Sequence, residues 1–121
     1  MKIDWEKIPT VGIRSGSTRK CICGDKMSAV RVTNAPDAVF DGKTHWHDND
    51  QILIMLSGSI TLMVDGKEFE CGSGDLVFFP SGSRHAAIRI GKEGAVYYEL
   101  FAPARPDQLP GWVGGSILRF D

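Results

Sequence analysis

The sequence predicts an all-β fold, and three observations carry that prediction. Glycine-containing turn signals recur at short intervals, among them the stretches 41–43, 57–59, 65–67, 72–75, 81–83 and 91–94. The segments between these turns are short and rich in β-branched and aromatic residues. No segment repeats apolar residues at helical spacing over three turns. We therefore expect a sandwich, a barrel or a jelly roll.

The expected strands follow one another closely along the chain. They are Ser28 to Thr33, Gln51 to Leu56, Ile60 to Val64, Leu76 to Phe79, Ala86 to Ile90 and Ala95 to Phe101. Gly58 is expected to end the strand that begins at Gln51. Asp65 and Gly66 favour the positive φ angles of a tight turn, so a hairpin should join Ile60–Val64 to Lys67–Cys71.

The length and composition predict one folded domain. A chain of 121 residues with 42% hydrophobic and 24% charged residues can bury a single core, so we expect one domain over 1–121. The terminal segments 1–10 and 103–121 are expected to pack on the domain or to serve as arms of a homodimer, with Trp5 or Trp112 near the contact. Ile52, Ile54 and Leu56 alternate with other apolar residues, so both faces of their strand are apolar. Because only one face can pack on the core, we expect the other to be buried against a second copy of the chain.

The charge balance excludes several classes of partner. Fourteen Lys and Arg residues against fifteen Asp and Glu residues give a formal net charge of -1, with no basic block that would bind a phosphate backbone. The longest apolar run, Ile52 to Leu56, is far shorter than the roughly 20 residues of a membrane span. The N-terminal residues carry acids where a signal peptide is apolar. We expect a cytoplasmic protein without nucleic-acid or membrane partners.

The three histidines form a candidate metal site. In a strand, His45 and His47 face the same side, because side chains two residues apart share a face. Gln51 follows at the start of an apolar strand, and His85 begins another. Three imidazoles and one amide oxygen would make a ligand set suited to a divalent first-row metal. The alternative is that the histidines of the polar stretch 41–50 are simply solvated.

Two stretches, 42–58 and 74–89, resemble the two motifs of the cupins, a family of small β-barrels. The first stretch matches through Gly42, His45, His47, Gln51 and Gly58, with Gln51 in place of an acid. The second matches through Gly74, Pro80, Gly82 and His85, with Arg89 in place of the final Asn. The resemblance implies a cupin jelly-roll β-barrel with one divalent transition metal per chain (Mn, Fe, Ni, Zn or Cu), and it implies the ligands His45, His47, Gln51 and His85. A neutral Gln51 would leave the metal's full charge to act on an anionic substrate.

The strand Ala95 to Phe101 and the phrase that follows it carry further candidates. Alternation places Tyr97, Glu99 and Phe101 on one face, which would line the cup. The phrase ELFAPARPDQL is similar to the ending of the pectin-pathway cupins that open the ring of unsaturated uronates, where an acid and an arginine flank the metal. This similarity implies catalytic roles for Glu99 as a general base and for Arg105 as a charge partner. The alternative is a structural ion pair between these two residues at the barrel rim.

One further arginine is predicted to bind substrate. Arg89 shares a face with His85 and Ala87 by alternation, so it should enter the cup and hold a substrate carboxylate beside Tyr97 and Phe101. The other arginines are expected on solvated faces or at a dimer rim, namely Arg14, Arg19, Arg31 and Arg84.

Together these features predict a homodimeric metal-binding enzyme. It would catalyse a redox-neutral lyase, isomerase or hydratase step on a small anionic, sugar-acid-like molecule. Two alternatives stay open from the sequence: an oxygen-dependent dioxygenase that uses three histidines, and a non-catalytic module that binds a small ligand in the cup.

Overall fold

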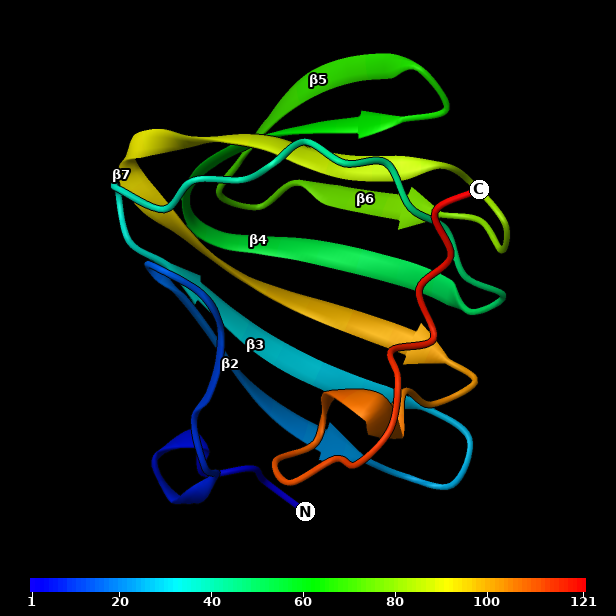
Figure 1. The fold of residues 1–121 in the computed structure, drawn as a ribbon. Coiled ribbons are helices and arrows are strands. Elements are labelled where there is room, and N and C mark those ends of the chain that lie inside the picture. Colours follow the sequence, from blue (N-terminus) through cyan, green and yellow to red (C-terminus); the bar gives the residue numbers. More distant parts are fainter.

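The computed structural model describes all residues 1–121, and it is built almost entirely of strands (Figure 1). The strands are β1 Val11–Arg14, β2 Ser17–Cys23, β3 Ser28–Asn34, β4 Asp50–Val64, β5 Lys67–Gly72, β6 Leu76–Phe79 and β7 His85–Ala102. Two single 3-10 turns, η1 Trp5–Lys7 and η2 Pro106–Gln108, are the only helical elements. No helix here has the length and apolar character needed to cross a membrane. The predicted all-β class is confirmed.

The two longest strands, β4 and β7, lie in the middle of the sheet that makes up the barrel. They pair with each other along most of their length, and the sheet order is β1-β2-β3-β7-β4-β5, with β6 paired to the first part of β4. Figure 1 shows β2 and β3 on one side of these strands and β5 on the other. All strand pairs are antiparallel. This arrangement is a jelly roll, as the sequence predicts.

Each of the two long strands was expected as two short ones, and glycines explain the difference. The segments 51–56 and 60–64 are one strand, β4, and the segments 86–90 and 95–101 are one strand, β7. Gly58 has a φ of 72°, and a Cβ on it would lie 2.0 Å from the carbonyl oxygen of Gly94. The pairing register shifts beside Gly58. Gly58 therefore bends β4 around the barrel instead of ending it, as glycines at bulges do.

The predicted hairpin is confirmed, and two further strands lie at the other edge of the sheet. Val64 pairs with Lys67, and Asp65 and Gly66 have φ angles of 47° and 84°. Strands β1 and β2 were not among the expected strands. In β2, Ser17 and Cys21 are buried, so the residues at odd positions of this polar strand face the barrel interior.

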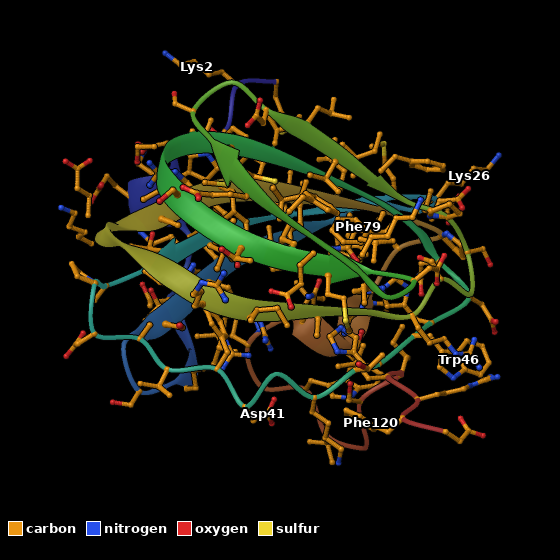
Figure 2. The ribbon with its side chains drawn as sticks, turned by 90° about the horizontal axis from the view of Figure 1, so that it is seen from above. Lys2, Lys26, Asp41, Trp46, Phe79 and Phe120 are labelled. Atoms are coloured by element: carbon orange, nitrogen blue, oxygen red, sulfur yellow. The ribbon has the colours of Figure 1, made fainter.

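The core fills the barrel between its curved walls. Leu53 and Met55 of β4 point inward and are buried, whereas Ile52 and Ile54 of the same strand are only partly buried on the outer face. Figure 2 shows Phe79 of β6 among the side chains inside the barrel. Thirteen of the 15 buried hydrophobic residues form one cluster. A cavity adjoins this cluster, and Gln51, His85 and Arg105 line it together with apolar residues.

Candidate active site

A cavity of about 390 Å³ lies inside the barrel. Its wall combines strands β1, β2, β3, β4, β6 and β7 with the C-terminal segment up to Leu118. The wall includes most of the residues expected from the sequence, namely His45, Gln51, His85, Tyr97, Glu99, Phe101 and Arg105. His47 is only 2% exposed and reaches the site through its contact with Gln51.

The histidines come together because the segment before β4 runs beside the start of β7. His45 and His85 exchange two backbone hydrogen bonds of 3.0 and 2.9 Å, which form an isolated antiparallel bridge. The ring centroid of His85 lies 4.5 Å from that of His45 and 5.0 Å from that of His47. His47 and His85 are buried, and His45 is partly buried. The alternative that His45 and His47 are simply solvated is therefore wrong.

Backbone carbonyls fix the orientation of the three rings. The Nδ1 atom of His47 lies 3.0 Å from the carbonyl oxygen of Asn49, and that of His85 lies 3.0 Å from the carbonyl oxygen of Ser83. The Nδ1 of His45 faces the carbonyl of Lys43 at 3.4 Å. Because a carbonyl only accepts, each Nδ1 is assigned the proton, and each Nε2 then carries a lone pair. Metal-binding histidines are held in this way.

Three acceptor atoms of the site lack a donor. The Nε2 of His85 is buried and has no hydrogen-bond partner. The amide nitrogen of Gln51 donates to Glu99, so the amide oxygen faces Nε2 of His47 at 3.0 Å. With Nδ1 of His47 protonated, its Nε2 and the Gln51 oxygen both present lone pairs to each other and repel. A cation bound between them would remove this repulsion. The residues therefore fit a divalent transition metal with three nitrogen ligands and one oxygen ligand.

The histidine side chains would have to adjust before they could share one metal. As they lie, no three His, Cys, Asp or Glu side chains form a group that could hold a metal ion. Gln51 is an amide and stands outside that set.

Burial sets the protonation states at the site. It lowers the pKa of His85 to about 4, with the charges of His45, His47 and Arg105 acting in the same direction. Burial also lowers the pKa of His45 and His47 below the ordinary value. All three are therefore neutral near pH 7, which is the form that binds metals. Burial raises the pKa of Glu99 to about 7, although the nearby arginines oppose this shift.

Arg105 is held by a carboxylate that sequence reasoning missed. Its guanidinium pairs with Asp107 through distances of 2.9 Å (Nη2 to Oδ2) and 3.3 Å (Nε to Oδ1), and it lies over the ring of Phe101. No ion pair joins Arg105 to Glu99, so the alternative of a rim ion pair between these two is wrong. The only sequence signal for Asp107 is its place two residues after Arg105, in the turn η2.

Arg89 lies outside the cavity, contrary to the expectation from the sequence. It is exposed and faces Glu68 on β5 at 3.6 Å. Thr61 pairs with Arg89 and Leu62 pairs with Ala87, so one extra residue bulges out of β7 between them. A bulge reverses the alternation of side chains. This reversal turns Arg89 outward and leaves it without a place in the site.

The fold and the site define a class of protein: a jelly-roll barrel that gathers three histidines at an internal cavity is a cupin. Residues 30–101, more than half of the chain, match the family model described as cupin domain. The chain belongs to this family.

A curated relative narrows the similarity within the family. The chain is 29% identical over 106 residues to the pectin degradation protein KdgF of Dickeya dadantii (strain 3937), a match that covers 86% of this chain and 94% of that protein. The resemblance to pectin-pathway cupins is thus confirmed.

Solved structures show the same fold. KdgF from Halomonas sp. superposes with a TM-score of 0.76 at 25% identity, over 86% of this chain and 94% of that one. An RmlC-like cupin from Shewanella frigidimarina gives a TM-score of 0.73 at 26% identity, over 84% and 89% of the two chains. Oxalate decarboxylase from Bacillus subtilis gives 0.69 at 23% identity, with 84% of this chain covering 28% of that chain, and shares the fold alone.

Proposed function

We propose that this cupin is a metal-dependent enzyme that catalyses a redox-neutral lyase, isomerase or hydratase step on a small, anionic, sugar-acid-like molecule. Ring opening of an unsaturated uronate is the reaction that the resemblance of the phrase ELFAPARPDQL to pectin-pathway cupins favours, and the similarity to the pectin degradation protein KdgF of Dickeya dadantii supports it. The observation that carries the proposal is the set of Nε2 atoms left free by carbonyl-bonded histidines, beside the amide oxygen of Gln51 and the carboxyl of Glu99.

The residues that would hold the metal are His45, His47, Gln51 and His85. A divalent metal bound there would supply Lewis-acid polarisation of a substrate oxygen. None of the four ligands carries a negative charge, because the histidines are neutral and Gln51 is an amide. The site therefore suits an anionic substrate better than a site with a carboxylate ligand would.

Glu99 is placed to move a proton within the cavity. It accepts a hydrogen bond from Gln51 and has no arginine partner, whereas the other carboxylate of the wall, Asp107, is taken up by Arg105. A carboxyl next to the ligand set can take a proton from substrate carbon or oxygen and return it. Glu99 is thus the proposed general base.

The remaining walls position the substrate. Arg105 is 7% exposed, and Asp107 holds its side chain rigidly over Phe101. The guanidinium lines the cavity and can pair with negative charge that develops on a substrate oxygen. Tyr97 and Phe101 supply an apolar wall that excludes water from the reacting atoms.

The test is anaerobic turnover of a 4,5-unsaturated galacturonate by protein loaded with each candidate metal. Turnover is measured as the loss of the substrate's ultraviolet absorbance. We expect turnover without oxygen, and we expect Glu99→Gln to lower kcat by about 100-fold or more, because proton transfer is lost. Glu70→Gln, an exposed carboxylate on β5, is the matched control. A strict need for oxygen would favour a dioxygenase, and ligand binding without turnover of any uronate, keto acid or hydroxy acid would favour a binding module.

A further inference from the structure

A second group of cationic side chains faces the same cavity from β1 and β2. Arg19 lies between Ser17 and Cys21 on the inward side of β2, and both neighbours are buried. Arg19 and Arg14 line the cavity wall. The sequence alone places both arginines on solvated faces, because β1 and β2 are not recognisable as strands and their inward sides cannot be assigned.

Neither of these arginines has a counter-ion in the protein. The three ion pairs of the molecule involve Arg89, Arg105 and Arg119. The guanidinium of Arg19 makes a single hydrogen bond, from Nε to the backbone oxygen of Gln108 at 3.0 Å. Its Nη atoms make no hydrogen bond within the protein, and Arg14 contributes only a contact over the ring of Phe40.

Gln108, the residue that touches Arg19, is itself incompletely paired. It is 7% exposed and lines the cavity, and its side-chain oxygen has no hydrogen-bond donor. An inward-facing guanidinium without a counter-ion costs free energy, since its charge is partly removed from water. Burial and the charge of Arg105 both lower the pKa of Arg19, which reflects this cost. An anion in the cavity would offset it.

The strand register separates this group from the histidines. Arg19 pairs with Val32, Val32 pairs with Tyr97, and Tyr97 pairs with Met55 of β4. The strand that carries Gln51 therefore lies three strand spacings from Arg19, or about 14 Å along the sheet at about 4.8 Å per strand. Arg19 and the candidate metal ligands line one cavity of about 390 Å³, which leaves space for a small molecule between them.

We propose that Arg19, with Arg14 beside it at the rim, forms a carboxylate-binding subsite that holds the acid group of the substrate away from the metal ligands. The inference rests on the proposed function, in which a small sugar acid enters the cavity. The planar guanidinium of Arg19 would bind the carboxylate through its free Nη donors, and Arg14 would add a second charge. This subsite is separate from Arg105, whose donors Nε and Nη2 are engaged by Asp107.

The test compares a sugar acid with its neutral counterpart. Binding of D-galacturonate and of D-galactose is measured by titration calorimetry and by chemical-shift perturbation, in EDTA and again with added Zn²⁺. We expect the protein to bind galacturonate more tightly than galactose. Arg19→Gln should weaken galacturonate binding by about tenfold or more, which is the loss expected when charge-assisted hydrogen bonds are removed. It should leave galactose binding unchanged. Arg19→Lys should recover part of the loss, because it keeps the charge but not the planar fork.

Two further variants separate the subsite from a general effect of charge or folding. Arg31→Gln makes the same change on β3 at a residue that does not line this cavity, and it should not alter the preference. Arg14→Gln removes a charge without removing any hydrogen bond of the protein, and it should weaken galacturonate binding less than Arg19→Gln does. Equal binding of the two sugars by the unchanged protein, or an undiminished preference in Arg19→Gln, would overturn the proposal. Binding in EDTA needs neither metal nor turnover. If the protein prefers galacturonate but turns over no substrate, the lack of turnover counts against the proposed reaction, and the preference still supports the subsite.

Discussion

His85 is the residue around which the candidate site is organised. Its ring contacts both other histidines, its Nδ1 faces a carbonyl, and its Nε2 has no partner. A buried nitrogen without a partner costs free energy, because it gives up its hydrogen bond to water. A metal ion would provide the missing contact, and the loss of that contact is directly measurable.

Substituting a histidine should remove the metal and leave the barrel. We expect His85→Ala or His47→Ala to weaken metal binding by about 100-fold or more, because one of four ligands is lost, while the hydrophobic core is unchanged. Metal content after dialysis, together with circular dichroism, checks this. A variant that is folded and keeps a full equivalent of metal would show that the ligand assignment is wrong.

Gln51 determines the charge of the candidate metal site. The substitution Gln51→Glu keeps an oxygen ligand but adds a negative charge at the metal, and it replaces the donor that now bonds Glu99 with an acceptor. We expect metal to be retained, kcat/KM for an anionic substrate to fall by about tenfold, and KM to rise, because electrostatic attraction is reduced. Steady-state kinetics at matched metal content measures the effect. Equal or faster turnover would argue against Lewis-acid catalysis and for the oxygen-dependent alternative.

Asp107 stabilises the fold through the buried guanidinium of Arg105. Burial alone would raise the pKa of Asp107, but the hydrogen bond and charge of Arg105 outweigh this and hold it below the ordinary value. A carboxyl with a depressed pKa in the folded state contributes stability above its unfolded pKa of about 3.9 and loses that contribution as the pH falls. Asp107 should therefore stabilise the protein at neutral pH.

The variant Asp107→Asn tests whether Asp107 stabilises the protein at neutral pH and loses this effect in acid. We expect it to lower the free energy of unfolding by about 3 kcal/mol at pH 7, since it leaves a buried charge unpaired. The difference from the unchanged protein should stay constant down to about pH 5 and shrink below it. Urea unfolding across this range measures it. A difference that grows as the pH falls would contradict the assignment.

The bend shared by β4 and β7 is the element that shapes the barrel. It brings the start of β7, with His85, to the side of the barrel reached by the segment before β4, where His45 and His47 lie. Gly58 and Gly94 sit at this bend with positive φ, and each lies too close to a backbone oxygen to accept a Cβ. The arrangement of the histidines thus depends on two residues that carry no chemistry.

Gly58→Ala should therefore be costly. We expect a loss of about 3 kcal/mol or more in the free energy of unfolding, because the new Cβ meets the carbonyl of Gly94 as well as an unfavourable φ. Gly66→Ala is the matched control, since Gly66 has a φ of 84° with nothing within 4 Å of a Cβ. It should cost only about 1 kcal/mol. Thermal unfolding of both variants measures these losses. Equal losses of stability in the two variants would contradict the steric argument.

The strands with regular alternation were the predictable part of the fold. The hairpin at Asp65–Gly66 and the inward face of β7 with Tyr97 and Phe101 follow from turn chemistry and from period-two alternation. Alternation fails where a bulge intervenes, which is why Arg89 was misplaced. A single sequence does not reveal such a bulge, because no residue type marks it.

Two features of the site could not be predicted from strand alternation or turn signals. The spacing of His45 and His47 predicts a shared face, but the pairing of Arg105 with Asp107 depends on the geometry of η2. The inward position of Arg19 requires knowing that β2 lies beside β3. Neither follows from strand alternation, since the first is set by the backbone of a 3-10 turn and the second by tertiary packing.

At the scale of the whole molecule, one face of the sheet is apolar and uncovered. Two rows of side chains cross its outer side: Ile52 pairs with Phe78 and Leu100, and Ile54 pairs with Leu76 and Tyr98. Leu76 and Phe78 are 61% and 52% exposed. Trp5 stacks on Tyr98 at 5.8 Å and extends this face. An apolar surface of this kind is typical of a protein interface.

We expect two copies of the chain to cover this face in a homodimer, because a self-complementary apolar patch favours a two-fold contact. Light scattering at micromolar concentration should give twice the chain mass of 13.3 kDa. Phe78→Lys should shift the protein toward monomer, since a charge in the centre of the patch would be desolvated on association. Val39→Lys, at an apolar residue 78% exposed in the loop after β3, is the matched control and should leave the dimer intact. A clean monomer for the unchanged chain, or a dimer that Phe78→Lys does not weaken, would contradict this assembly.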